Sequence, residues 1–430
     1  MFVSRRQFIK QAAGSATIGL LAPRLLPGSA QASELQASAG RRIFVVIQLE
    51  GGNDGLNTVI PYTDTRYYAA RPTLAFKESE LVDSTGASTI ISNEFGLHPS
   101  MGAIKSLYDQ GRVAIVNGVG YPNPSLSHFL SMDIWHTANL SGLGSEGWLG
   151  KYADSALAGI AGLPAVSVGG LLPKSFLSQK VVIPSIITFQ LYDFLTDPVY
   201  PGDAANQFGT FERDAGAGSG SSGLGSAIDA TAINAVEGAL KVKTQVAGYS
   251  SSVQYPPNNP LAAALQMLAQ ILTTISESTL VYCALGSFDH HSSQIDHVDG
   301  KPDRLSGLHA QLLSWFSDAV NAFYDDMAAH GLADSTLIMQ WSEFGRRVEE
   351  NTSFGTDHGT AAPLFVIGNP VKGGIFGSQP SINTIDLDSA GNMKFAVDFR
   401  SVYSTVLDRW LGVDSGPILG QRFEDIGFLA

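Results

Sequence analysis

The stretch Ile43–Leu49 (IFVVIQL), which runs into Glu50-Gly51-Gly52-Asn53-Asp54-Gly55, decides the fold class of this chain. A run of mostly apolar, β-branched-rich residues of this length predicts a strand that is buried on both faces. Such strands belong to parallel sheets that are covered by helices on both sides. The polar cluster that follows places a carboxylate, Asp54, at the carboxyl end of the strand.

The same arrangement recurs along the chain. Residues 279–285 (TLVYCAL) run into Gly286-Ser287-Phe288-Asp289-His290-His291, and residues 335–341 run into Ser342-Glu343-Phe344-Gly345-Arg346. A further pair, Asp357-His358, comes just before the apolar run 363–368. Because the carboxyl ends of parallel strands form one rim where ligands bind, residues far apart in sequence can converge there. The pattern predicts a hydrolytic metal site.

Apolar runs alternate with helical patterns over most of the chain, which is typical of βαβ units around a parallel sheet. We expect strands at residues 43–49, 113–119, 165–168, 280–285, 336–341 and 364–367, and helices at 99–108, 305–329 and 399–411. Residues 171–262 break this rhythm and are interpreted as an insertion that could cap the rim. It should hold a short β segment at 181–187, a Gly/Ser-rich surface loop at 214–226 and helices at 227–246.

The first 32 residues are typical of a twin-arginine export signal. Arg5-Arg6 precedes an apolar stretch at residues 12–22, and Ala30-Gln31-Ala32 is a small-residue cleavage site. The apolar stretch is about half of the ~20 residues that a transmembrane helix needs. We therefore expect a periplasmic or secreted protein, exported folded, whose mature chain begins near Ser33 and forms one domain over residues 33–430. A retained basic anchor is the alternative.

Composition and charge exclude several partners. The formal net charge is −13, and loss of four signal-peptide cations makes the mature chain more acidic still. Nucleic acid and anionic lipid are therefore not expected partners. Cys283 is the only cysteine in the sequence, so no internal disulfide can form. No segment after the signal is long and apolar enough to span a membrane.

Two candidates lie in the first third of the chain. Asp54 could reach a divalent metal from a glycine-rich turn, although Asn-Asp-Gly is equally typical of an Asx turn. Ser127 precedes a helix pattern, where it is either an activated nucleophile near backbone N–H groups or an ordinary helix N-cap. His128 is harder to explain as a cap and is interpreted as a ligand or a substrate contact.

The densest group of metal-ligand residue types begins at Asp289. We expect Asp289 and His291 to point to one side, because alternate residues of an extended segment do so, while His290 points away. His297 is more typical of a solvated loop residue.

The remaining candidates lie between residues 343 and 358. Glu343 could complete a metal shell, and Arg346 could bind an oxyanion or pair with Glu343. His358 is the best single candidate for a ligand, with Asp357 orienting it. Carboxylate and imidazole donors suit a divalent metal, and zinc, manganese and calcium are the candidates.

Taken in order, Asp54, Ser127, Asp289 with His291, Glu343 and His358 resemble the site layout of the alkaline phosphatase and sulfatase superfamily. The chain is most similar to family 1501 of the domains of unknown function, through the motifs Gly51-Gly52-Asn53-Asp54-Gly55, Ser127-His128-Phe129, Ser342-Glu343-Phe344-Gly345-Arg346, Asp357-His358-Gly359 and Asp398-Phe399-Arg400-Ser401-Val402-Tyr403. The resemblance implies a three-layer α/β fold, one or two metals and a nucleophile at a helix start. Phe344 stands where active phosphatases carry a ligand histidine, so one metal site should be lost or weakened.

These observations predict an exported metal-dependent hydrolase of a phosphate or sulfate ester, with Ser127, His128 and Arg346 in catalytic roles. Its substrate would be a small-molecule or polymer ester. The alternative is a non-catalytic periplasmic binding or assembly protein on the same scaffold, which the Phe344 substitution also fits. No cysteine near Ser127 could supply the formylglycine of sulfatases, so ordinary sulfatase chemistry is not expected.

Overall fold

The computed structural model describes residues 40–192, 206–207, 209–210 and 224–430. The predicted signal peptide and mature start near Ser33 lie outside the described residues, as do residues 214–223 of the predicted Gly/Ser-rich loop. The described chain divides into two compact units. The smaller contains Ser145–Ser250 and Gln270–Tyr282, and the larger contains Arg42–Gly144, Ser251–Ala269 and Cys283–Ala430. The single-domain interpretation and the insertion around 171–262 stay predictions.

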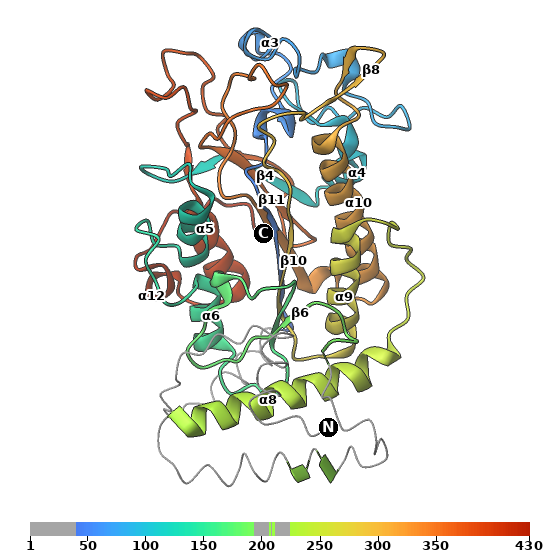
Figure 1. Ribbon diagram of the computed structural model, residues 1–430, viewed down its shortest axis with the longest axis vertical. Coiled ribbons are helices and arrows are strands. Elements are labelled where there is room, and N and C mark those ends of the chain that lie inside the picture. Colours follow the sequence, from blue (N-terminus) through green and yellow to red (C-terminus); the bar gives the residue numbers. More distant parts are fainter. Residues whose placement is uncertain (1–39, 193–205, 208, 211–223) are drawn as a thin grey trace, which may run out of the picture. The chain divides into compact units, whose positions relative to one another are not determined.

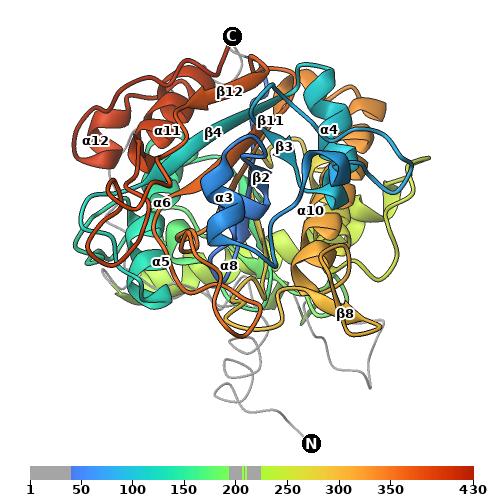
Figure 2. The ribbon, with the colours of Figure 1, turned by 90° about the horizontal axis from the view of Figure 1, so that it is seen from above.

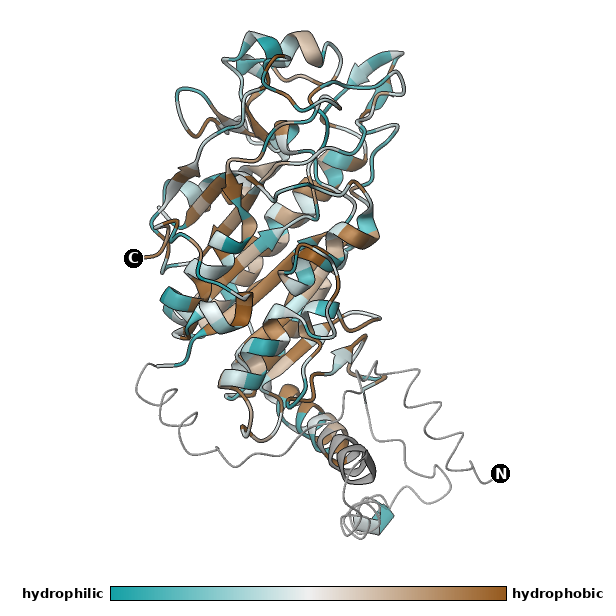
Figure 3. Cartoon of the chain, turned by 90° about the vertical axis from the view of Figure 1, so that its left-hand side faces the viewer, coloured by the Kyte–Doolittle hydropathy of each residue, from teal (hydrophilic) through white to brown (hydrophobic). Residues whose placement is uncertain are grey.

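A mixed sheet forms the centre of the larger unit, with strands in the order β12-β4-β11-β10-β1-β7, of which β7 contributes residues 283–285 to this unit and residues 280–282 to the smaller one. Their bounds are β1 Ile43–Leu49, β4 Val113–Gly120, β7 Leu280–Leu285, β10 Thr336–Trp341, β11 Ala362–Ile367 and β12 Gly374–Gly377, and β13 (Val397–Asp398) pairs with β4. Strand β1 is parallel to β10, and β12 and β13 are parallel to β4. Every residue of β1, β10 and β11 is buried, and apolar residues run along these strands (Figure 3). The predicted α/β fold with a mostly parallel central sheet is confirmed.

One strand runs against the others. β11 is antiparallel to both β10 and β4, with Ile338 opposite Ile367 and Leu364 opposite Val116. The chain therefore enters β11 at the same rim where β1, β4 and β10 end. Asp357 and His358 come just before β11, so the direction of β11 places them at this rim. There they meet residues that come just after the other strands.

Helices cover both faces of this sheet in the larger unit. On one side lie α4 (Gly102–Asp109) and α10 (Leu308–Ala329), and on the other α5 (His128–Thr137), α11 (Phe399–Thr405) and α12 (Ser415–Leu419) (Figures 1 and 2). The Trp135 ring of α5 stacks on Trp341 of β10 with 5.0 Å between centroids, and the Phe316 ring of α10 lies against Phe365 of β11 with 6.1 Å between centroids. Large apolar side chains thus attach each helical layer to the sheet.

The other elements of the larger unit are short, apart from a helix that both units share. They are β2 Val59–Ile60, α3 Thr65–Ala70, β3 Gly96–Leu97, β8 Asp296–Val298, β9 Lys301–Asp303 and a π-helical turn at Val406–Leu411, and α9 (Pro260–Thr274) belongs to both units. Strand β2 pairs with β3, and β8 pairs with β9.

The smaller unit contains α6 (Trp148–Ala156), β5 (Ala165–Val168), β6 (Ser185–Ile186) and α8 (Leu224–Gln245). Strands β5 and β6 are parallel, with Ser167 opposite Ser185. The buried Asp154 carboxylate accepts hydrogen bonds from backbone N–H groups of residues 179–181, which fixes that turn. In the described part of the chain, no helix combines the length and apolarity needed to cross a membrane.

Candidate metal centre

Four chain segments meet at the rim of the larger unit. The backbone N–H of Glu50 after β1 donates to Leu285 O of β7 at 2.9 Å, and Phe288 N donates back to Glu50 O at 2.9 Å. An isolated antiparallel bridge joins Arg346 to His358, and α5 begins at His128. The sheet topology therefore brings residues 128, 289, 343 and 358 together.

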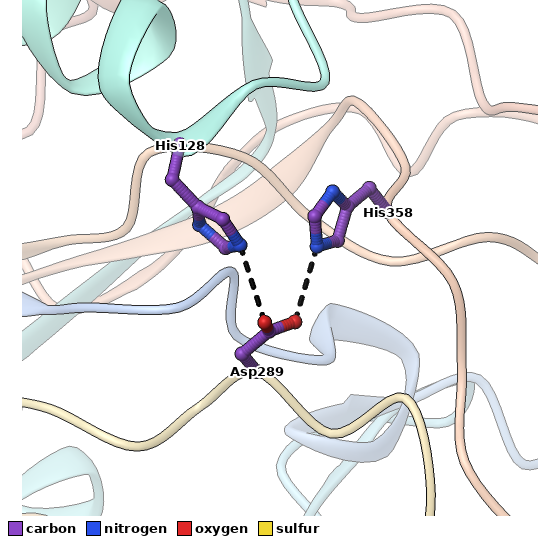
Figure 4. A group of neighbouring side chains, drawn as sticks. All are labelled: His128, Asp289 and His358. Carbon is purple, nitrogen blue, oxygen red and sulfur yellow. Dashed lines mark hydrogen bonds and ion pairs between the residues drawn. The ribbon is translucent and has the colours of Figure 1, made fainter.

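Three side chains face one another at this rim: His128, Asp289 and His358 (Figure 4). Their potential ligand atoms all lie within 4.8 Å of one another. The Nε2 of His128 is 3.4 Å from Asp289 Oδ2, and the Nε2 of His358 is 3.1 Å from Asp289 Oδ1. His291 joins them, with its Nε2 3.2 Å from Asp289 Oδ1. We call these four residues the histidine–aspartate cluster.

The other ring nitrogen of each imidazole is held by a group that can only accept a hydrogen bond. His128 Nδ1 lies 2.8 Å from Glu343 Oε1, His291 Nδ1 lies 3.0 Å from Asp357 Oδ1, and His358 Nδ1 lies 2.8 Å from the Leu126 carbonyl. Each Nδ1 must therefore carry the proton. Metal-bound histidines in proteins are oriented in this way by carboxylates and backbone carbonyls.

With Nδ1 protonated, the three Nε2 atoms all face one carboxylate, that of Asp289. The Nε2 atoms of His291 and His358 are only 2.9 Å apart, and the buried His128 Nε2 makes no hydrogen bond. Two lone pairs at that separation repel unless a proton or a cation lies between them. The donor set is thus suited to a divalent metal.

Neighbouring charges act on these groups. The hydrogen bond to Glu343 raises the pKa of His128, whereas desolvation lowers the pKa of His358. Burial raises the pKa of Asp289, but hydrogen bonds from Arg346 and His358 outweigh it, so the pKa of Asp289 is lowered overall. Asp289 is therefore a carboxylate at neutral pH, as a metal ligand must be.

The buried Arg346 side chain connects the loops of the site. Its guanidinium donates to carbonyls of Gly51, Gly52 at 2.7 Å, Phe288 at 3.0 Å and Thr356 at 2.8 Å, and to Asp289 Oδ1 at 2.8 Å. Its side chain is 0% exposed. Arg346 thus pairs with Asp289 rather than with Glu343, and all its donor nitrogens are occupied by the protein. We infer a positioning role in place of the predicted oxyanion-binding role.

Glu343 is buried behind the cluster rather than within it. Besides His128, its Oε1 accepts from Gly51 N at 2.8 Å, and its backbone carbonyl accepts from Ser131 Oγ at 2.5 Å. The Phe344 ring packs below the cluster, with its centroid 4.9 Å from that of His128 and 4.7 Å from that of His358. Glu343 therefore orients a candidate ligand, while Phe344 forms an apolar floor.

The Asp54 carboxylate makes its contacts outside the histidine–aspartate cluster. Its Oδ2 accepts from Arg71 Nη1 at 2.6 Å and from Gln294 Nε2 at 2.7 Å, and its side chain is 1% exposed. Burial raises the pKa of Asp54, but the Arg71 charge and hydrogen bond prevail and lower it to about 2. The structure does not bring Asp54 into the histidine–aspartate cluster, so a metal role for it is not supported by these contacts.

Ser127 occupies the N-cap position of α5, next to His128. Its side chain makes no capping hydrogen bond, and the residue is exposed. The ordinary N-cap interpretation is therefore wrong for its hydroxyl. The hydroxyl stays available to a ligand at the rim.

His290 and His297, the other two histidines near His291 in the sequence, lie outside the cluster. Both ring nitrogens of the buried His290 lack a partner in the described residues, and burial lowers its pKa to about 4. His297 is exposed and its ring lies 4.5 Å from that of Phe354. Asp357 orients His291 and not His358, so the prediction that it orients His358 is wrong; the Leu126 carbonyl orients His358 instead. Leu126 carries no sequence signal of that role.

A family model described as "Protein of unknown function (DUF1501)" matches residues 226–421. The match agrees with the predicted family over the region that carries Asp289, His291, Glu343, Arg346 and His358. No sequence relative was found among curated proteins.

Several crystal structures share features of the fold. They include a protein in the alkaline phosphatase superfamily from Vibrio parahaemolyticus (11% identity, 89% of this chain and 69% of that one, TM-score 0.37) and the PsFucS1 sulfatase from Pseudoalteromonas sp. (12%, 93% and 76%, TM-score 0.36). The C-terminal periplasmic domain of EcEptC from Escherichia coli, in complex with Zn, is also similar (10%, 77% and 74%, TM-score 0.31). With every TM-score below 0.5, these similarities carry no information about the chemistry of this chain.

Proposed function

We propose that this protein is a metal-dependent hydrolase of a phosphate or sulfate ester. One observation carries the proposal: three imidazoles, each with Nδ1 held by an acceptor, direct Nε2 toward the single carboxylate of Asp289. Retaining such a set at an open rim is costly unless a cation binds it. The side chains of Asp289 and His291 are 45% and 47% exposed, so a substrate can reach them.

His128, Asp289, His291 and His358 would hold the metal. Three nitrogen donors and one oxygen donor suit zinc or manganese, whereas calcium prefers oxygen ligands alone. We therefore favour zinc or manganese over calcium. Bound there, the metal would polarise the ester and lower the pKa of the attacking group.

The residues of the chain supply position and charge. Glu343, Asp357 and the Leu126 carbonyl fix the three imidazole rings, and the buried Arg346 fixes the Asp289 carboxylate. Ser127, which precedes His128 and whose hydroxyl makes no capping hydrogen bond, is the candidate nucleophile. In the water-mediated alternative, Ser127 positions the substrate.

Turnover of 4-nitrophenyl phosphate and 4-nitrophenyl sulfate, with and without added zinc or manganese, tests the proposal. Metal-dependent turnover that His358→Ala abolishes would support it, and absence of turnover in metal-loaded protein with either ester would count against it. Activity that survives Ser127→Ala would exclude the covalent version and retain the water-mediated one.

We further propose that the protein is exported by the twin-arginine route and acts in the periplasm or outside the cell. The support is the Arg5-Arg6 signal pattern in the sequence. Replacement of both arginines by lysine should keep the protein in the cytoplasm, which fractionation would detect. Equal export of both versions would refute the route.

A further inference from the structure

The proposed substrate is an anion, but the candidate metal centre is surrounded by carboxylates. Asp289 lies in the cluster, and Glu343 and Asp357 hold two of its imidazoles. The cation that contacts the cluster, Arg346, is buried and donates only to the protein. A divalent metal would be largely neutralised in this setting. Recognition of an anionic ester therefore calls for another positive charge with free donors.

The next residue, Arg347, is placed to supply it. Arg346 pairs with His358 across the antiparallel bridge, and both side chains reach Asp289. Successive side chains alternate in extended backbone, so Arg347 belongs to the other face, opposite Asp357. The backbone agrees, because Arg347 N donates to Asp357 O at 3.0 Å.

The guanidinium of Arg347 has no protein partner among the described residues. Its Nε is buried and makes no hydrogen bond in the described part of the chain. Its positive charge acts at longer range on the carboxylates of Asp357 and Asp388. An unsatisfied donor is costly in a folded protein, so the Arg347 guanidinium has donors to offer a bound anion.

The position of Asp357 connects Arg347 to the metal centre. Asp357 binds His291, whose Nε2 faces Asp289, and the Asp357 side chain is 49% exposed. Asn351 closes this side, with its Nδ2 2.8 Å from the His291 carbonyl oxygen and 3.4 Å from Asp357 Oδ1. Arg347 thus stands beside an open part of the cluster rather than inside the core.

We infer that Arg347 binds anionic oxygens of the substrate, a tetrahedral oxyanion group of the phosphate or sulfate class, at the outer side of the histidine–aspartate cluster. The inference rests on the proposed function and deepens it, because it names the residue that recognises the charge of the ester. A guanidinium suits this task because its planar donors match two oxyanion oxygens at once.

The test measures anion binding separately from metal content. Wild-type protein, Arg347→Gln, Arg347→Lys and the control Arg409→Gln are titrated with inorganic phosphate and, in a second arm, inorganic sulfate by calorimetry, after elemental analysis of each sample. Arg409 is exposed and pairs with Asp425, so its replacement controls for loss of one positive charge.

We expect Arg347→Gln to weaken binding of one or both anions about 10- to 100-fold, the loss of a charge-assisted hydrogen-bond pair, at unchanged metal content. Arg347→Lys should retain part of the affinity, and Arg409→Gln all of it. The anion whose binding is weakened by Arg347→Gln is the one that Arg347 recognises. Unchanged affinity in Arg347→Gln, equal loss in Arg409→Gln, or no anion binding by the wild type would overturn the inference. Absence of metal from the wild type would instead overturn the proposed function, whatever the anion titrations give.

Discussion

At the scale of single residues, the Glu343–His128 contact shows how the chain prepares a ligand. The Glu343 carboxylate holds the proton on His128 Nδ1, which leaves His128 Nε2 to bind a metal. The same Glu343 oxygen also accepts a hydrogen bond from Gly51 N. Replacing Glu343 with Gln keeps the size of the side chain but removes its charge. We expect metal affinity to fall about 10- to 100-fold, as for other groups that orient metal-bound histidines.

Competition with a chromogenic chelator measures that affinity. Glu350→Gln is a matched control, because Glu350 accepts backbone hydrogen bonds from Thr73 and Leu74 away from the cluster. A Glu343→Gln protein with wild-type metal affinity would contradict the orienting role.

Asp54 gives a prediction about pH. Its pKa is lowered to about 2 in the folded protein, against about 3.9 in unfolded chains, so its ionised form stabilises the fold. That contribution, about 2.6 kcal/mol, is complete above about pH 5 and is lost as the pH falls through 2. Denaturant unfolding at pH 2 to 5 should show this slope in the wild type and less of it in Asp54→Asn.

Asp54→Asn also tests whether Asp54 is a structural residue or a metal ligand. Asp54→Asn leaves the buried Arg71 without its carboxylate and should lower the free energy of unfolding by about 3–5 kcal/mol. Asp64→Asn, which weakens a largely exposed pair with Arg66, should cost less than about 1 kcal/mol. Folded Asp54→Asn protein should keep its metal, and stoichiometric loss of metal would restore Asp54 as a ligand.

The sequence was sufficient for some residues of the candidate site and not for others. Asp289, His291 and His358 could be selected because acids and histidines at strand ends share one rim. The place of Asp54 could not be predicted, because its partner Arg71 lies on a separate segment and carries no motif. Likewise, neighbouring arginines 346 and 347 look equivalent until the bridge to His358 assigns them to opposite faces.

At the scale of elements, the turn after β1 depends on a glycine. Gly51 has φ +118°, and a Cβ there would lie 2.4 Å from Asp289 N. Gly51→Ala must therefore displace the segment that carries Asp289. We expect at least a 10-fold loss of metal affinity together with destabilisation.

Gly86→Ala provides the matched control. Gly86 has φ +85° with open space around its Cα, so alanine adds backbone strain of about 1–2 kcal/mol and nothing else. Both variants should lose stability in a thermal melt, but only Gly51→Ala should lose metal. Equal metal affinity in the two proteins would show that the β1 turn does not position Asp289.

Hydrophobic periodicity predicted where strands and helices lie in the sequence, but it did not predict the direction of each strand in the sheet. The predicted strands at 165–168, 280–285 and 336–341 have the bounds of β5, β7 and β10, because buried strands have a clear apolar run. Antiparallel β11 was not foreseen, since an apolar run has no sign of direction. The helix at 399–411 is present, but Val406–Leu411 is π-helical, a change in hydrogen bonding that no residue type announces.

At the scale of the whole molecule, metal binding should be coupled to stability. The cluster draws its members from α5, the loop after β7 and the loop before β11, so a metal would cross-link segments 128, 289 and 358. At a free metal concentration 100 times its Kd, the folded state gains about 2.7 kcal/mol. Adding zinc to chelated protein should raise the Tm by several degrees, and it should leave His358→Ala unchanged. An equal rise in both proteins would place the stabilising metal elsewhere.

If the histidine–aspartate cluster holds a metal, elemental analysis of the purified protein will detect it. The protein is purified from its natural compartment without chelator or metal-affinity tag, beside His358→Ala and His297→Ala, a control at an exposed position of β8. We predict near-stoichiometric zinc or manganese in the wild type and in His297→Ala, and its loss from folded His358→Ala. A wild-type protein without metal, or a His358→Ala protein that retains it in full, would contradict metal binding by the cluster.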